Sequence, residues 1–167
     1  MNNNDQNQFK RLLEQGTALL RAGKTAAALP LLEKAHQMAP DNTDAALNLS
    51  GAYILSKRFN AAVPILEKLA RQEPENPMVW TNLGAAYLGN PVLAQDEDQM
   101  RAIEAFKQAL TVDPLAPHAA YNVGLIYRDR QENEEAIRWF RRALQANPHD
   151  KDARRLIARL SGNRGEE

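Results

Sequence analysis

Prolines divide the sequence into segments of nearly equal length. The interval from Pro40 to Pro74 equals the interval from Pro114 to Pro148, whereas the interval from Pro74 to Pro114 is longer by six positions. The shared interval, about 34 residues, is typical of repeat proteins, in which each repeat buries its apolar face against the next one. The longer middle interval predicts a repeat of this length with one six-residue insertion.

Two short motifs recur in these segments at a constant spacing. In the first motif a glycine or serine precedes a tyrosine by three residues, as in Gly84 and Tyr87, and further copies end at Tyr53 and Tyr127. Residues spaced three or four apart share one face of a helix. The second motif pairs an alanine with a large apolar residue four positions later, as in Ala62 with Leu66, Ala102 with Phe106 and Ala136 with Phe140. Each repeat is therefore predicted to contain two amphipathic helices joined by a turn.

A helix–turn–helix repeat of this length with these positions resembles the tetratricopeptide repeat (TPR) family. The resemblance implies an all-α fold, a right-handed α-solenoid (superhelix) of helix–turn–helix repeats. Its departures are mild, such as Ser50 at a glycine position and Leu69 at an alanine position. The expected domains are a disordered polar tail over 1–8, a TPR domain over 9–160 and a tail over 161–167. The TPR domain is expected to comprise repeats over 9–42, 43–76, 77–116 and 117–150, an insertion near 89–98 and a capping helix over 151–160.

Polar side chains near the expected helix starts suggest caps. Asp41 is placed to cap the first helix of the second repeat, and Asn76 before Pro77 is placed to cap that of the third. In the insertion, Asp96 and Gln99 fit a capping box. The acidic run that begins at Asp96 lacks the spacing and the glycine of a calcium loop, so no metal is expected there.

Composition and motifs exclude several functions. Lys plus Arg and Asp plus Glu number 21 each, so no overall field favours nucleic acid. The absence of cysteine excludes disulfides and zinc–thiolate sites. His36, His118 and His149 belong to no catalytic or metal motif, so we expect no enzyme, no cofactor and no metal. No apolar run reaches the length of a membrane span, so no membrane insertion is expected. The N-terminus lacks a signal pattern, so a cytoplasmic location is expected, with export still open if a leader was removed.

Asparagine recurs at one position of successive repeats. Asn48, Asn82 and Asn122 occupy the sixth position of three first helices, so stacked repeats would align them along the inner surface. An asparagine amide both donates and accepts, which suits the peptide groups of an extended ligand, and we expect the three amides to be unpaired in the free protein. Similar ladders grip ligand main chain in O-linked N-acetylglucosamine transferase and kinesin light chain. Asparagine is also common at this position in TPR repeats generally, and both interpretations stay open.

The positions that the resemblance places in the groove form an apolar trough with a basic C-terminal end. The lysine and arginine positions of the carboxylate clamp in chaperone-binding members hold other residues here, among them Leu13 and Met78, so a chaperone tail is not an implied ligand. The predicted peptide-binding groove comprises Asn48, Asn82, Asn122, Leu13, Leu47, Ile54, Met78, His118, Tyr121, Leu125, Arg128, Arg155 and Arg159.

The resemblance implies a non-catalytic protein–protein interaction module that binds a peptide or partner segment in its concave groove. The alternative is a self-assembling scaffold, a homo-oligomer that uses the same groove. Val92 and Leu93 in the insertion are expected to fold back onto the rim of the groove or to help close it.

Overall fold

The computed structural model describes residues 2–162, and the secondary structure within that range is entirely helical. The all-α prediction is confirmed. The helices are α1 (Asn3–Arg21), α2 (Thr25–Met38), α3 (Thr43–Leu55), α4 (Phe59–Gln72), α5 (Pro77–Leu88), α6 (Asp96–Val112), α7 (Ala119–Asp129), α8 (Asn133–Ala146) and α9 (Lys151–Gly162).

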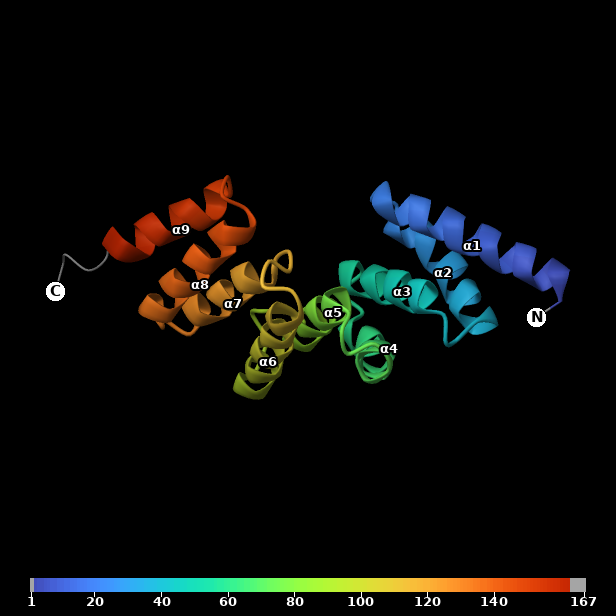
Figure 1. The fold of residues 1–167 in the computed structure, drawn as a ribbon, viewed down its shortest axis with the longest axis horizontal. Coiled ribbons are helices and arrows are strands. Elements are labelled where there is room, and N and C mark those ends of the chain that lie inside the picture. Colours follow the sequence, from blue (N-terminus) through green and yellow to red (C-terminus); the bar gives the residue numbers. More distant parts are fainter. Residues whose placement is uncertain (1, 163–167) are drawn as a thin grey trace. The chain divides into compact units, whose positions relative to one another are not determined.

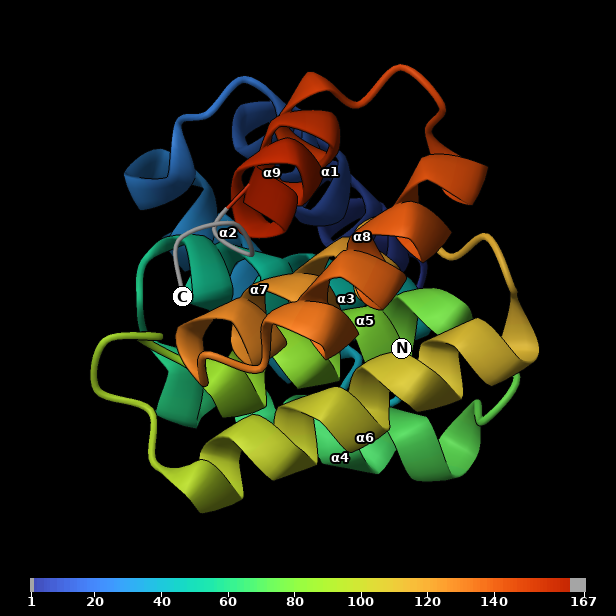
Figure 2. The same cartoon turned by 90° about the vertical axis from the view of Figure 1, so that its left-hand side faces the viewer.

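The helices belong to two compact units, unit 1 (Met1–Pro74) and unit 2 (Glu75–Glu167). In unit 1, α1 packs on α2, α2 on α3 and α3 on α4. In unit 2 the same pattern runs from α5 to α9, each helix packing on the next one in the sequence. Figures 1 and 2 show these neighbours side by side, for example α8 beside α9. Packing between sequence neighbours is the arrangement expected of helical repeats.

Within a repeat, the glycine of the first helix makes room for the large residue of the second. A Cβ atom added at Gly84 would lie 2.8 Å from the ring of Phe106, and one added at Gly124 would lie 2.7 Å from the ring of Phe140. Both rings are fully buried. Glycine is therefore required here by the close approach of two helices. In unit 1, Ser50 takes the glycine position and is itself buried, and its hydroxyl donates to the carbonyl of Ala46, so the polar group is satisfied.

Within residues 2–162 the packed pairs α1 with α2, α3 with α4, α5 with α6 and α7 with α8 form four hairpins, and three of these are closed by the same three-residue turn. Its middle residue is Gly23, Lys57 or Gln131, with φ of 70°, 58° and 63°. In the second hairpin the N–H of Lys57 donates to the carbonyl of Ile54, and the next N–H donates to Tyr53, at 2.9 and 2.8 Å. The other two turns have the same pair of bonds. This is the Schellman motif, which satisfies carbonyls at the end of a helix through a left-handed residue.

The insertion is divided between a helix and a loop. Helix α6 has 17 residues where α4 and α8 have 14 each, so about one turn is added at its start. The remaining residues form the loop 89–95. Its tip is a local turn in which the side chain of Asn90 accepts from the N–H of Val92 and the Asn90 carbonyl accepts from Leu93. Val92 is 89% exposed and Leu93 is 70% exposed, so the expectation that they fold back onto a rim is wrong.

The first helix begins earlier than its sequence suggests. The side chain of Asn2 accepts from the N–H of Asp5 at 2.9 Å, and the carboxylate of Asp5 accepts from the N–H of Asn2 at 3.3 Å. This reciprocal pair is a capping box. It starts α1 at Asn3, so the disordered tail expected over 1–8 is wrong from residue 3 onward. At the other end α9 continues to Gly162, two residues past its expected end, and residues 163–167 of the expected tail lie outside the described part.

Two of the predicted caps are displaced by one residue. Asn42, and not Asp41, caps α3 by accepting from the N–H of Ala45 at 2.9 Å. Asp41 instead pairs with Lys68 at 2.7 Å, and this contact lowers the pKa of the Asp41 carboxyl. In α6 the capping box does not involve Asp96 and Gln99. Instead, the carboxylate of Asp98 accepts from the N–H of Gln95. The third predicted cap, Asn76 at the start of α5, is confirmed, because its side chain accepts from the N–H of Met78.

Candidate peptide-binding site

A stripe of predicted groove residues on α7 faces the capping helix α9. Tyr121, Leu125 and Arg128 are half-buried and follow one another at helical spacing. Tyr121 and Leu125 pack against the apolar cluster that α8 and α9 share. Burial raises the pKa of Tyr121, Asp152 raises it further, and Arg155 lowers it. Tyr121 thus lies within electrostatic reach of the α9 charges, and the structure brings these parts of the predicted groove together.

Arg128 and Arg159, both predicted groove residues, line one pocket of about 300 Å³. Arg128 comes from α7 and Arg159 from α9. The other lining residues are Asn133, Leu156 and Leu160, none of which the sequence predicted as part of a site. A signal was present in the sequence, because Leu156 precedes Arg159 by three residues and so shares its face of the helix.

His118 and Tyr121 border a second pocket of about 240 Å³. His118 precedes α7 in a left-handed conformation with φ of 65° and caps the helix through no side-chain bond. Its side chain is exposed. The remaining wall comes from the ends of α6 and α8 and the connector between α6 and α7, including Leu110, Ala143 and Leu115.

The asparagines differ in how their amides are used. Asn82 and Asn122, both in unit 2, are half-buried, and within residues 2–162 their side-chain amides have no hydrogen-bond partner. Asn48, in unit 1, donates to the carbonyl of Asp44 in its own helix at 2.8 Å. The expectation of three unpaired amides is therefore wrong for Asn48, whose short side chain reaches back one helical turn.

The other predicted groove residues of unit 1 are partly used by its own core. Leu13 packs on the buried cluster that contains Leu32 and Leu49. Leu47 and Ile54 are half-buried. In unit 2, Met78 is 60% exposed at the start of α5, and Arg155 is exposed and paired with Asp152 at 3.4 Å.

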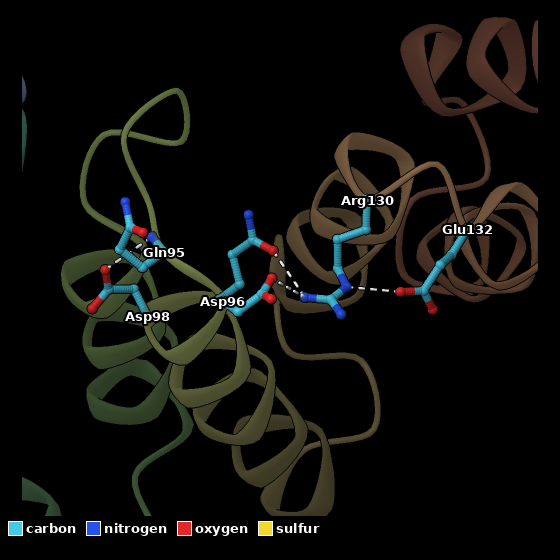
Figure 3. A network of polar contacts seen from close by, with 6 residues as sticks. Gln95, Asp96, Asp98, Arg130 and Glu132 are labelled. Carbon is cyan, nitrogen blue, oxygen red and sulfur yellow. Dashed lines mark hydrogen bonds and ion pairs between the residues drawn. The ribbon is translucent and has the colours of Figure 1, made fainter.

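The start of α6 is held by an arginine from the turn after α7. Arg130 donates to Asp96 at 3.0 Å, to Gln99 at 3.1 Å and to Glu132 at 2.7 Å, as Figure 3 shows for the two carboxylates. Hydrogen bonding to Glu132 raises the pKa of Arg130. Asp96 and Gln99, which the sequence predicted as a capping box, therefore accept hydrogen bonds from Arg130 instead. These bonds hold the helical turn that the insertion adds to α6.

The described residues contain no constellation for metal chemistry. No group of three or more His, Asp or Glu side chains in residues 2–162 could hold a metal ion. In His36, Nδ1 is buried without a hydrogen-bond partner, and burial and Lys68 lower the pKa of the imidazole. Over the same range, no helix is both long enough and apolar enough to cross a membrane.

The hairpins and their glycine-to-aromatic contacts define a helical-repeat protein. Comparison with protein families gives the particular family: residues 19–88 and residues 91–151 each match a model described as tetratricopeptide repeat. The chain belongs to the tetratricopeptide repeat family. Members of this family are generally non-catalytic interaction modules.

Solved structures share this fold over most of their length. TTC0263, a thermophilic TPR protein in Thermus thermophilus, is 23% identical with a TM-score of 0.78, over 94% of this chain and 83% of that one. MamA 41-end from Desulfovibrio magneticus RS-1 is 22% identical with a TM-score of 0.72, over 86% and 77%. MamA AMB-1 is 30% identical with a TM-score of 0.64, over 81% and 76%. No curated protein matches the sequence.

Proposed function

We propose that the chain binds an extended peptide segment of a partner protein along the first helices of its repeats, without catalysing a reaction. The observation that carries the proposal is the state of Asn82 and Asn122. Their amides are half-exposed and have no partner within residues 2–162, so each can bind a ligand peptide group without first breaking an internal bond.

The side chains around these amides support the same function. Met78 offers an exposed apolar contact in the first turn of α5, and Tyr121 and Leu125 offer half-buried ones along α7. An amide that fixes the main chain and neighbouring apolar positions that select side chains form a common mode of peptide recognition. Leu13, Leu47, Asn48 and Ile54 are the corresponding proposed contacts in unit 1, and His118, Arg128, Arg155 and Arg159 complete those in unit 2.

A second candidate function is self-association. Within unit 2 it is favoured by two consecutive apolar side chains that lie in water in the loop 89–95, namely Val92 at 89% exposure and Leu93 at 70%. Large exposed apolar groups gathered on a surface are typical of interaction sites. Light scattering across a concentration series distinguishes the candidates, because a protein that stays monomeric at high concentration is not a self-assembling scaffold.

The asparagine hypothesis predicts a loss of binding without a loss of stability. Peptides are first selected from a display library against the full chain, and their affinities are then measured by fluorescence anisotropy. The double variant Asn82→Ala with Asn122→Ala should weaken binding by about 0.5–1.5 kcal/mol for each lost amide pair. Its free energy of unfolding should change by less than about 0.5 kcal/mol, because partly solvated polar groups without partners are removed.

The matched control is Glu104→Ala, an exposed position on α6 whose carboxylate only accepts from Gln108 in the same helix. It should alter neither binding nor unfolding appreciably. If the asparagine variants unfold at lower denaturant concentration while the remaining folded protein binds the peptides normally, these side chains are structural and the proposed site is wrong.

A further inference from the structure

We propose that the pocket between Arg128 and Arg159 binds a carboxylate of the partner segment, with an aliphatic side chain of that segment against Leu156 and Leu160. The proposal rests on the proposed function, because it assigns a chemical class to one end of the bound segment. It concerns the junction of the last repeat with the capping helix.

The charge of the capping helix is the first observation. Residues 151–162 contain four basic side chains and one acidic side chain, so their net charge is +3. The basic residues are Lys151, Arg154, Arg155 and Arg159, and the acidic residue is Asp152. The whole chain has a net charge of zero. Positive charge is thus concentrated on the helix that forms one wall of the pocket, and such a local excess favours an anionic partner.

The three arginines of α9 differ in whether their guanidinium groups have an acceptor. Arg154 donates to the carbonyl of Pro148, and Arg155 pairs with Asp152. Arg159 is exposed and has no acceptor within residues 2–162. Of the three arginines on this helix, the one that lines the pocket is therefore the one whose donors remain available inside the described part of the chain.

Across the pocket, Arg128 is held in place by a neighbouring carboxylate. Its Nε and Nη2 both donate to Oδ1 of Asp129, at 2.8 and 2.5 Å. A guanidinium has five N–H donors, so this contact orients Arg128 and leaves other donors available. The guanidinium loses less conformational freedom on binding an anion because its geometry is already restricted.

The charge balance of the pocket selects a carboxylate among anions. Arg128 and Arg159 contribute two positive charges, and Asp129 beside Arg128 contributes one negative charge, which leaves a balance of +1. A carboxylate matches this balance and suits arginine geometry. A phosphate near neutral pH carries more charge than the pocket offsets, and Asp129 would repel it.

The pocket also has an apolar wall. Leu156 is half-buried and Leu160 is 9% exposed, and both line the same space as the two arginines. Asn133, at the start of α8, adds an amide that can donate or accept. A ligand that joins one carboxylate to one aliphatic side chain therefore satisfies both kinds of surface.

N-acetyl-leucine, which carries both groups, is the probe that tests the proposal. It is titrated into the full-length ¹⁵N-labelled chain while the Nε–Hε signals of Arg128 and Arg159 are followed by NMR. We expect saturable shifts of both signals that weaken as salt is added. Arg159→Gln should weaken binding roughly tenfold or more, the effect of losing a charge-assisted hydrogen bond.

Control measurements separate specific recognition from a general field. Arg141→Gln removes an exposed arginine from α8 with the same change in net charge, and it should leave the affinity within about twofold. N-acetyl-leucinamide lacks the carboxylate and should not shift the arginine signals. N-acetyl-leucyl-aspartic acid α-amide has a blocked C-terminus and carries its carboxylate on the aspartate side chain, and its binding relative to N-acetyl-leucine shows whether the site prefers a chain terminus or an acidic residue.

The proposal is overturned if the amide binds as tightly as the acid, if inorganic phosphate binds more tightly than N-acetyl-leucine, or if Arg141→Gln and Arg159→Gln have equal effects. Shifts that never saturate overturn it too. These outcomes are independent of the asparagine experiment. Selected peptides that lose affinity in the asparagine variants and not in Arg159→Gln would leave the proposed function standing and remove only the carboxylate site.

Discussion

Deletion of residues 150–167 should cause aggregation or a large drop in melting temperature. The deletion removes α9, whose Ala153 and Leu160 belong to one buried cluster with Ala136, Ile137 and Phe140 of α8. That cluster would become exposed to water, at a cost of about 25 cal/mol for each Å² of apolar surface, or several kcal/mol in total. Differential scanning calorimetry and light scattering of the truncated chain measure both effects.

A chain that lacks only residues 163–167 is the matched control, because it keeps all of α9. It should melt close to the full-length chain. Equal melting temperatures for the shorter deletion and for the deletion of residues 150–167 would show that α9 does not protect the apolar face of α8.

Replacement of Gly124 by alanine should destabilise the protein by about 1–3 kcal/mol, the usual cost of overpacking a buried contact. The new methyl group would lie 2.7 Å from the ring of Phe140, which is fully buried, so the ring or the backbone would have to shift. The denaturant midpoint should fall with an unchanged slope. Gly84→Ala should behave similarly, because its methyl group would meet the ring of Phe106 at 2.8 Å.

The control for this experiment is another helical glycine. An added Cβ at Gly51 meets nothing within 4 Å, so Gly51→Ala should stabilise the protein by roughly 0.5–1 kcal/mol through helix propensity. The double variant Gly124→Ala with Phe140→Leu should recover part of the lost stability if the ring is the obstacle. Destabilisation of similar size at Gly51 would instead attribute the effect to helix propensity or backbone conformation.

The sequence predicted the fold well because its strongest constraints repeat. Gly84 recurs as Gly124 and Phe106 recurs as Phe140, and each pair marks a point where two helices touch. A single copy of such a pattern is ambiguous, whereas copies at a fixed spacing limit the chain to a helical repeat.

Helix ends were predicted less accurately because neighbouring polar residues offer competing caps. Asp41 and Asn42 are both good capping residues, and the sequence does not show that Lys68 binds the first and leaves the second to cap α3. The same holds for Asp96, which a distant arginine binds. These outcomes depend on tertiary contacts, and local pattern carries no information about them.

The candidate site shows the same division between local and tertiary information. The spacing of the repeats predicted that Asn82 and Asn122 occupy the same position in their repeats. It did not predict that the side chain of Asn48 donates a hydrogen bond to its own helix. Arg128 and Arg159 were both predicted to face a groove, whereas their meeting at one pocket follows from the way α9 packs beside α7 and α8. The exposure of Val92 and Leu93 reflects a loop whose hydrogen bonds are satisfied within itself.

The turns closed by Gly23, Lys57 and Gln131 also allow folding to begin locally. Each turn joins two helices through three residues and makes its own hydrogen bonds, so a hairpin can close before any other part of the chain has folded. The entropy of closing a loop grows only logarithmically with its length, so the longer loop 89–95 delays the third hairpin only modestly. Folding dominated by such local contacts is fast, and it can start at any of the hairpins.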